Sequence, residues 1–329
     1  MKRVAIALMA ACAAVILPGA RAATLQLDAP VQEAELTPDA EAAIEKALLY
    51  LSRTQAEDGG WLDSHRVSSA ALALMAFMVK GDFPGREPYG AVLDKAVDFL
   101  IRESVRSGGY MGDSMYEHAL ATLALSEAWG MSDREGIRDV LKRAVDVILR
   151  AQDRCGGWRY QPRPCGADIS VTVMQVVALA SAKEAGIFVP DKTIDDAIAY
   201  VKALQEKASG GFGYAGASQP SLARTAAGVT ALMMCGQRDS AEVRRGLEYL
   251  LGLDAGTFTN AEFYHYGHYY AIQAMYQAGE SYYQNWYPKI REALVKSQRP
   301  DGAWGHDYTT PMSVLILGVP YRYLPIYQR

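Results

Sequence analysis

A glycine followed closely by an aromatic residue recurs six times along this chain at nearly constant spacing. The aromatic residues of these glycine–aromatic marks are Trp61, Tyr110, Trp158, Phe212, Phe258 and Trp304. Successive marks lie 49, 48, 54, 46 and 46 positions apart. Self-similarity at a fixed period indicates one structural unit copied along the chain. The spacing therefore predicts six repeats of a single unit within one large domain.

Two kinds of helical pattern alternate between the marks. The first kind is amphipathic, which is typical of surface helices, and covers 38–55, 89–105, 133–152, 191–205, 240–251 and 282–298. The second kind follows each mark and is apolar almost all round, which indicates burial on every side; examples are 70–75, 173–179 and 228–233. The sequence shows no strand pattern. Six outer and six inner helices predict an all-α fold, a closed α/α6 toroid.

The helix order also predicts where a ligand would bind. If outer and inner helices alternate in direction, the six inner helices run parallel and their N-termini meet at one end of the ring. That end gathers positive helix-dipole ends and unpaired backbone N–H groups, which favour anions. Because ligand sites commonly lie in cavities between helices, we expect the site at this end.

The first 22 residues have the pattern of a secretory signal peptide. A charged start precedes an apolar run over 5–17 and a small-x-small cleavage site at 20–22. The run is short for a membrane span, and no later segment is long and apolar enough to form one. We therefore expect a periplasmic or secreted protein without an integral membrane span. The expected organisation is a signal peptide over 1–22, an extended segment over 23–36 and a single toroid domain over 37–329.

The charge of the mature chain argues against nucleic acid as a partner. Removal of the signal peptide takes away three basic residues and no acidic ones, so the formal charge changes from −4 to −7. An acidic exported chain is a poor candidate for binding nucleic acid. We expect a small-molecule partner, a lipid or a glycan.

Two cysteines bracket a loop rich in glycine and proline. Cys155 and Cys165 lie ten positions apart, and an oxidising compartment favours a disulfide between them. That bond would hold the intervening Trp158 and Arg159 in place. No cysteine or histidine pair at zinc-site spacing accompanies them, so neither a metal nor a cofactor is predicted.

Three marks share the longer pattern Gln-x3-Gly-x-Trp, beginning at Gln55, Gln152 and Gln298, and 205–212 is a looser copy. This pattern resembles the repeat of the prenyltransferase and squalene oxidase superfamily, which includes squalene-hopene cyclases and protein prenyltransferase β-subunits. Residues 218–226 also look like the cyclase segment that opens an inner helix. The resemblance runs from residue 37 to the C-terminus and is closest to secreted, single-ring bacterial members. It implies that the Gln and Trp tie an outer helix end to the next inner helix.

The resemblance implies cyclase activity only where the acid motif is present. Class II terpene cyclases protonate an alkene with the central acid of an Asp-x-Asp-Asp motif, and this chain contains no such motif. The nearest counterpart is 165–168, where Ala167 occupies the proton-donating position. No local segment matches the zinc-binding set of protein prenyltransferases. We therefore expect a toroid that binds an elongated ligand, an isoprenoid-like lipid or an oligosaccharide, without class II cyclase chemistry.

All five histidines fall near the beginnings of the predicted inner helices. Histidine can act as an acid, a base or a ligand near neutral pH, although wet helix starts also tolerate polar residues. Arginine and tyrosine side chains accompany the histidines at the same end of the ring. The residues predicted to bind the ligand are His65, His118, Arg159, Arg224, Tyr269 and His306.

A cluster of tyrosine and histidine over 264–270 suggests an alternative function. His265 and His268 share one helix face beside Tyr264. Polysaccharide lyases on α/α toroids transfer protons with a tyrosine or histidine and hold the uronate carboxylate with a cationic or polar group. These three residues are candidate catalytic residues; the simpler interpretation is an aromatic wall that packs or binds.

Asp168 is the fourth candidate catalytic residue because it lies at the acid position of the cyclase family. Its simpler role is to cap the N-terminus of an inner helix. A third function, that of a protein-interaction scaffold, follows from the shape shared with thioester-type toroid domains of the complement family. The absence of a Cys-x-x-Gln segment excludes covalent capture. The sequence leaves open whether the protein is an enzyme.

Overall fold

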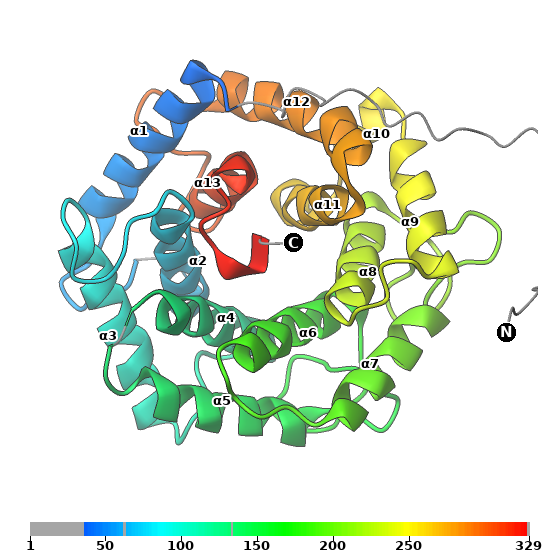
Figure 1. Cartoon of the computed structure of the whole chain (residues 1–329), viewed down its shortest axis with the longest axis horizontal. Helices are drawn as coiled ribbons and strands as arrows, with labels where there is room; N and C mark the ends of the chain where they lie inside the picture. Colours follow the sequence, from blue (N-terminus) through cyan, green and yellow to red (C-terminus); the bar gives the residue numbers. More distant parts are fainter. Residues whose placement is uncertain (1–35, 62–63, 133, 328–329) are drawn as a thin grey trace, which may run out of the picture. The chain divides into compact units, whose positions relative to one another are not determined.

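Helices arranged in two concentric rings make up the described part of the chain (Figure 1). The computed structural model describes residues 36–61, 64–132 and 134–327, all within the compact unit Glu33–Arg329. The predicted signal peptide and the segment up to residue 35 lie outside the described residues. The outer helices are α1 (Pro38–Thr54), α3 (Gly90–Arg106), α5 (Ile137–Ala151), α7 (Asp191–Ala203), α9 (Ala241–Leu251) and α12 (Glu280–Ser297).

The inner ring consists of the other long helices, which alternate with the outer ones along the chain. They are α2 (Arg66–Val79), α4 (Met115–Met131), α6 (Ile169–Glu184), α8 (Leu222–Met234), α11 (Tyr264–Ala278) and α13 (Thr309–Leu317). Each inner helix contacts the next one, and α13 contacts α2, so the ring is closed. The predicted all-α double ring is confirmed, and no strand occurs among the residues that the structure describes.

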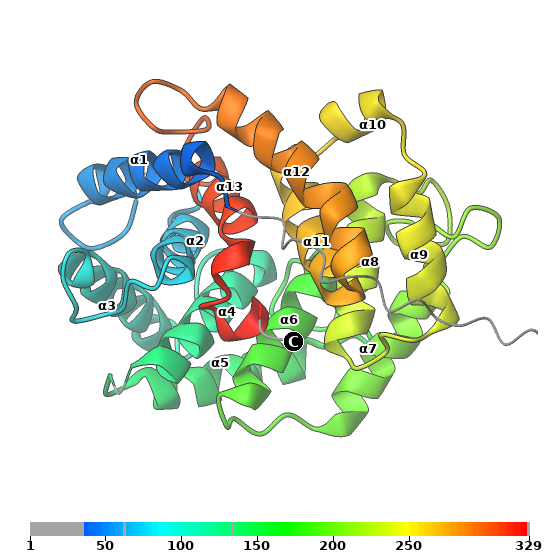
Figure 2. The same ribbon diagram turned by 45° about the horizontal axis from the view of Figure 1, so that its top comes forward.

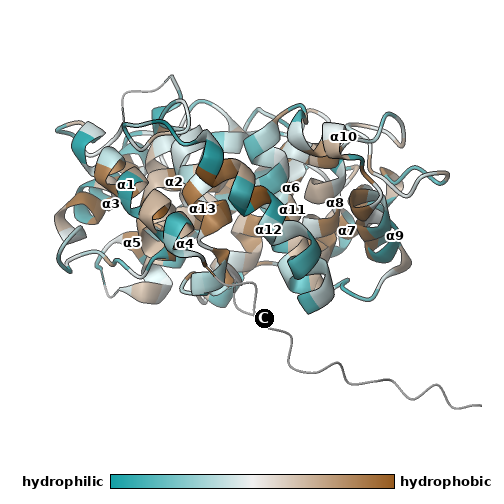
Figure 3. Ribbon diagram, turned by 90° about the horizontal axis from the view of Figure 1, so that it is seen from above, coloured by the Kyte–Doolittle hydropathy of each residue, from teal (hydrophilic) through white to brown (hydrophobic). Residues whose placement is uncertain are grey.

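Burial follows the two sequence patterns. In α2 every residue from Val67 to Val79 is buried, because outer helices lie on one side and inner neighbours on the others. In α1 the buried residues recur every three or four positions, at Ala40, Ala43, Ile44, Ala47, Leu48 and Leu51. Figure 3 shows the same contrast as hydrophilic and hydrophobic residues side by side along the outer α12. Among the described residues, no helix is both long and apolar enough to cross a membrane.

The glutamine of each longer mark joins two neighbouring outer helices. The Nε2 of Gln55 donates to the carbonyl of Gly59 at 3.1 Å and to that of Val92, in α3, at 2.9 Å. Gln152 repeats this arrangement with Gly156 and with Thr193 in α7. The resemblance implied that both the Gln and the Trp tie an outer helix end to the next inner helix. For the glutamine this is wrong, whereas the backbone N–H of Trp158 does donate to the Oγ1 of Thr172 in the inner helix α6 at 3.0 Å. The amide reaches the next outer helix because the turn itself lies against that helix.

In the longer marks, the glycine and the tryptophan both stabilise the turn that follows the outer helix. Gly156 has a φ of +97°, and a Cβ added there would lie 2.1 Å from the carbonyl oxygen of Asp196 in α7. The buried ring of Trp158 donates from Nε1 to the carbonyl of Ile148 in the preceding outer helix at 2.8 Å. Glycine therefore allows the turn to approach α7, and tryptophan anchors it to α5.

The fifth mark departs from the predicted turn. Gly256 and Phe258 lie in a short additional helix, α10 (Ala255–Thr259), whose N-terminus is capped by Asp254. Phe258 packs against His268 and Trp286, with ring centroids 4.5 and 4.8 Å apart. The aromatic residue of this fifth mark still packs between α11 and α12, but the inner helix α11 begins only at Tyr264. This extra turn moves residues 260–263 to the rim of the ring.

The last repeat closes the ring on the first. The Nε2 of Gln298 donates to the carbonyl of Ala43 in α1 at 2.7 Å. The chain then passes through α13 into two short helices, η1 (Val319–Tyr321) and η2 (Pro325–Tyr327), which lie inside the ring (Figures 1 and 2). The backbone N–H of Ile326 donates to the Oε2 of Glu127, near the C-terminal end of α4. The C-terminal segment therefore lies at the end of the ring opposite the inner-helix N-termini.

Candidate functional site

A cavity of about 800 Å³ opens where the N-termini of the inner helices meet. All six inner helices supply lining residues from their first turn or from the residues just before it. The polar lining residues are Ser64, His65, Ser68, Ser114, Glu117, Ser170, Arg224, Glu262, His265, His306 and Thr309. The others are Tyr116, Tyr160, Ile169, Tyr214, Ala223, Phe263, Tyr264, Tyr266 and Tyr308. The prediction that a ligand site would lie at this end therefore coincides with a real cavity.

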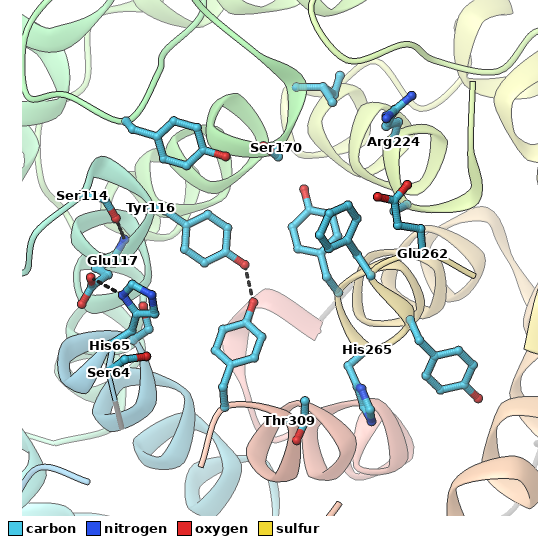
Figure 4. Close-up of a pocket in the computed structure, with 18 of the residues that line it drawn as sticks. Ser64, His65, Ser114, Tyr116, Glu117, Ser170, Arg224, Glu262, His265 and Thr309 are labelled. Carbon is cyan, nitrogen blue, oxygen red and sulfur yellow. Dashed lines mark hydrogen bonds and ion pairs between the residues drawn. The ribbon is translucent and has the colours of Figure 1, made fainter. Parts of the chain in front are cut away.

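A carboxylate and an imidazole meet on one wall of the cavity (Figure 4). Glu117 is 3% exposed, and its Oε1 lies 3.1 Å from the Nδ1 of His65. Ser114 caps α4 by accepting from the N–H of Glu117, which fixes the glutamate in the first helical turn. The side chain of His65 is 65% exposed, so its Nε2 remains for a ligand. This pair can move a proton or hold a hydroxyl group.

Two tyrosines from the inner helices on either side of α2 meet at the cavity. The hydroxyl groups of Tyr116, in α4, and Tyr308, just before α13, are hydrogen-bonded to one another (Figure 4). Burial raises the pKa of Tyr308 to about 12 and that of Tyr116 well above its usual value. Both side chains are therefore neutral phenols near neutral pH, able to donate and accept hydrogen bonds.

The segment predicted to be catalytic contributes neutral groups as well. Burial raises the pKa of Tyr264 to about 12. Burial, with a smaller effect of nearby His306, lowers the pKa of His265 to about 4. His265 is therefore uncharged at neutral pH and unsuited to neutralising an anion. Tyr264 can donate a proton but is not a phenolate base at that pH.

Fixed charges are few in the cavity and partly balance. Arg224 is the one arginine or lysine among the described lining residues, and its Nη1 donates to the carbonyl of Gln219 at 2.6 Å. Its guanidinium lies 5.8 Å from the ring centroid of Tyr214. Glu262 lies on the same side of the cavity as Arg224 (Figure 4). The cavity therefore combines aromatic faces, hydroxyl groups and both signs of charge.

Comparisons with solved structures find the same architecture in two kinds of enzyme. An inactive variant of the α-1,6-mannanase GH76A of Salegentibacter sp. HEL1_6, in complex with α-1,6-mannotriose, has a TM-score of 0.66 and 9% sequence identity, covering 86% of this chain and 99% of that one. A variant of the type II terpene cyclase MstE from Scytonema, in complex with geranylgeranyl dihydroxybenzoate, has a TM-score of 0.63 and 14% identity, covering 87% and 98%. The fold is a terpenoid-cyclase-like α/α toroid. No model of a known family matches the sequence, and no curated protein does.

Two of the predicted histidines belong to the packing of the toroid. His118 is fully buried; its Nδ1 accepts from the N–H of Met111, and its Nε2 donates to the carbonyl of Ala144. His268 is also fully buried, with Nε2 donating to the carbonyl of Phe258. Neither residue lines the cavity, because each points away from it toward an outer helix or its connection. His65, His265 and His306 do line it.

Three other predicted residues lie outside the cavity. Asp168 is fully buried and caps α6, where its Oδ1 accepts from the N–H of Val171 at 3.0 Å. Arg159 is half-exposed, with its Nε 3.9 Å from the Oδ2 of Asp168. Tyr269 is buried in the core of the toroid. Asp168 approaches the cavity only through Ser170, whose Oγ donates to its Oδ1 at 2.6 Å.

The loop between Cys155 and Cys165 is closed without a disulfide in this structure, where both residues are free thiols. This differs from the predicted bond. The carboxylate of Asp153 accepts from the N–H of Cys155 at 3.0 Å and from that of Gly166 at 2.8 Å. These hydrogen bonds lower the pKa of Asp153 and hold the two ends of the loop together. Among the described residues, no cluster of histidine, cysteine and acidic side chains could hold a metal ion.

The lining residues that sequence reasoning missed include Tyr116, Glu117, Glu262, Phe263 and Tyr308. A signal for Glu117 was present, because Ser114 and Glu117 have the spacing of a capping box. In a ring of parallel inner helices, the first turn of every one of them faces the same mouth. That rule makes Tyr116 and Glu117 candidates without any motif, but it includes the neighbouring His118 equally, which points to α5. Phe263 carried no comparable signal, since the extra helix α10 was not foreseen.

Proposed function

We propose that this protein is an exported glycan-binding protein whose cavity holds an oligosaccharide. The observation that carries this proposal is the lining itself, in which tyrosine rings occur together with hydroxyl, imidazole and carboxylate groups. A sugar ring presents C–H faces that pack on aromatic rings and hydroxyl groups that bond to such polar atoms. The mannanase with the same fold binds a mannotriose, which supports this ligand class.

A lipid fits the same lining less well. Only Ile169, Ala223 and Phe263 among the lining residues have hydrocarbon side chains. An isoprenoid chain would leave the buried hydroxyl group of Tyr266 without a polar partner, which is unfavourable. The missing Asp-x-Asp-Asp motif removes the acid of class II cyclases as well. A purely structural scaffold has less support, because the mouth of the ring is hollow.

Calorimetric titration with glycans and prenyl compounds tests the proposal. Size-graded α-1,6-mannan, cellulose and polygalacturonate oligomers are compared with geranylgeranyl dihydroxybenzoate. We expect a glycan to bind, and Glu117→Gln to weaken that binding about tenfold, because the variant loses a charged hydrogen-bond acceptor. Glu292→Gln, on the exposed face of α12, is the matched control and should bind like the wild type. Binding of the prenyl compound alone, or of none of these, would refute the proposal.

A second candidate function is elimination from an acidic glycan, favoured by the contact between His65 and Glu117. In this reaction the Nε2 of His65 takes the C5 proton of a uronate, and those electrons form the C4–C5 double bond. The C4–O bond breaks, and its oxygen receives a proton from the hydroxyl of Tyr264. Glu117 would keep the accepting nitrogen oriented, as paired carboxylates do for catalytic histidines.

Ultraviolet absorbance of unsaturated uronate products measures this activity. With the wild type, polygalacturonate or another acidic glycan should give a steady rise in ultraviolet absorbance. With His65→Ala, the rate of this rise should fall at least a hundredfold. His306→Ala, at the same mouth, serves as the control for general damage to the cavity. A flat absorbance trace with the wild-type protein would refute elimination and would leave the proposal of glycan binding unaffected.

A further inference from the structure

Phe263 stands at the mouth of the cavity in a conformation that phenylalanine rarely adopts. It directly precedes α11 and has φ 56° and ψ 47°, in the left-handed region. For a bulky L-residue this region brings Cβ close to the following carbonyl oxygen, so glycine or asparagine normally occupies it. The side chain of Phe263 is 67% exposed. This position therefore costs stability twice, through backbone strain and through exposure of an aromatic ring.

Packing within the protein does not account for this ring. Phe263 makes no ring contact with another described aromatic residue, whereas the adjacent Tyr264 packs on both His265 and His268. Strained residues that persist at a ligand cavity indicate a role in function rather than in folding. Glycine at this position would adopt the same backbone conformation without strain. The presence of phenylalanine instead indicates that its aromatic ring has a role of its own.

The surroundings of Phe263 suit a sugar ring. Glu262, the preceding residue, is exposed and lines the same mouth, as does Arg224 at the start of α8 (Figure 4). An exposed aromatic face beside a carboxylate and a guanidinium offers stacking for C–H groups and charged partners for hydroxyl groups. Glu262 and Arg224 lie on the side of the cavity away from Glu117 and His65 (Figure 4).

We propose that Phe263, Glu262 and Arg224 form an outer subsite that holds one sugar unit of an oligosaccharide projecting from the cavity. This inference rests on the proposed function and deepens it. The ligand is then a chain longer than the cavity rather than a single sugar. Phe263 is a specificity-determining residue that favours longer chains and takes no part in bond cleavage.

The variant Phe263→Gly separates a binding role from a structural one. We expect a midpoint of thermal unfolding equal to or above that of the wild type, because glycine adopts this conformation without strain. We expect affinity for the longest oligomers of the glycan ladders to fall roughly fivefold to tenfold. Affinity for the shortest members should not change. Phe263→Trp should retain binding, since it keeps an aromatic face.

Phe188→Gly is the matched control, because that phenylalanine is 80% exposed and does not line the cavity. It should leave the affinity for every oligomer unchanged. Glycan binding that Phe263→Gly does not alter would overturn the outer subsite alone. A marked drop in its unfolding temperature would show that the ring is structural and would overturn the subsite as well. If the wild type binds no oligomer, the proposed function and the subsite fail together.

Discussion

Replacing Gly156 by alanine is expected to destabilise the protein by about 4 kcal/mol or more. The new Cβ would lie 2.1 Å from the carbonyl oxygen and 2.6 Å from the carbonyl carbon of Asp196. These are backbone atoms of α7 and cannot rotate away, so the turn and the outer helix must separate. The φ of +97° adds strain for any L-residue. Urea unfolding followed by circular dichroism measures the loss.

Gly108→Ala is the matched control for this substitution. Gly108 lies in the second glycine–aromatic mark and also has a positive φ, +64°, but a Cβ there would meet nothing within 4 Å. The expected loss is about 1 kcal/mol, from backbone strain alone. Equal losses in the two variants would show that the approach of the turn to α7 does not matter for stability.

Acidification is expected to weaken the fold partly through His118. Burial lowers the pKa of this histidine from its ordinary value of 6.5 to about 4. Below pH 6.5 the unfolded chain binds a proton that the folded chain excludes until about pH 4. The free energy of unfolding should therefore fall across this window, by about 3 kcal/mol for His118. The stability that this group contributes is fully present above pH 6.5.

Urea unfolding at a series of pH values, for the wild type and His118→Gln, tests this expectation. The variant loses hydrogen bonds and should be less stable at neutral pH, so the readout is the pH slope, not the absolute stability. Its slope between pH 6.5 and 4 should be smaller than that of the wild type. Burial raises the pKa of Glu127 to about 7, so this residue makes the free energy of unfolding rise as the pH falls. Because Glu127 is present in both proteins, its effect cancels when their slopes are compared. Parallel curves would contradict the assignment.

The fold could be predicted from the sequence because its determinants are local and repeated. The pattern Gln-x3-Gly-x-Trp occurs at the ends of the outer helices α1, α5 and α12, with a looser copy at the end of α7, and apolar stretches follow it. Boundaries such as Asp191–Ala203 differ from the predicted range by only a few residues. The route of the Gln55 amide was mistaken because its second acceptor, Val92, lies 37 positions away. Such a partner is set by how helices pack, which no local pattern records.

The location of the candidate site could be predicted from the sequence, but the identity of the residues that line it could not. Helix direction places every inner N-terminus at one mouth, and His65, Arg224, Tyr264, His265 and His306 do lie there. Rotation about the helix axis decides the rest. His118 follows Glu117 by one position, yet the histidine points to α5 and the glutamate lines the cavity. A shift of one residue turns a side chain by about 100°, and the sequence of a helix buried on all sides does not mark which face is the inner one.

The hydrogen bond from Gln298 to Ala43 joins residues 255 positions apart and brings the last repeat against the first. In an open stack of repeats, terminal units need special polar faces, and stability grows as units are added. Here the first and last units cover each other, so neither needs such a face. Deleting one unit would uncover apolar faces of its two neighbours, because each inner helix packs on the next one around the ring. Each repeat therefore depends on both of its neighbours, and the mouth gathers six helix ends only when every repeat through α13 is present.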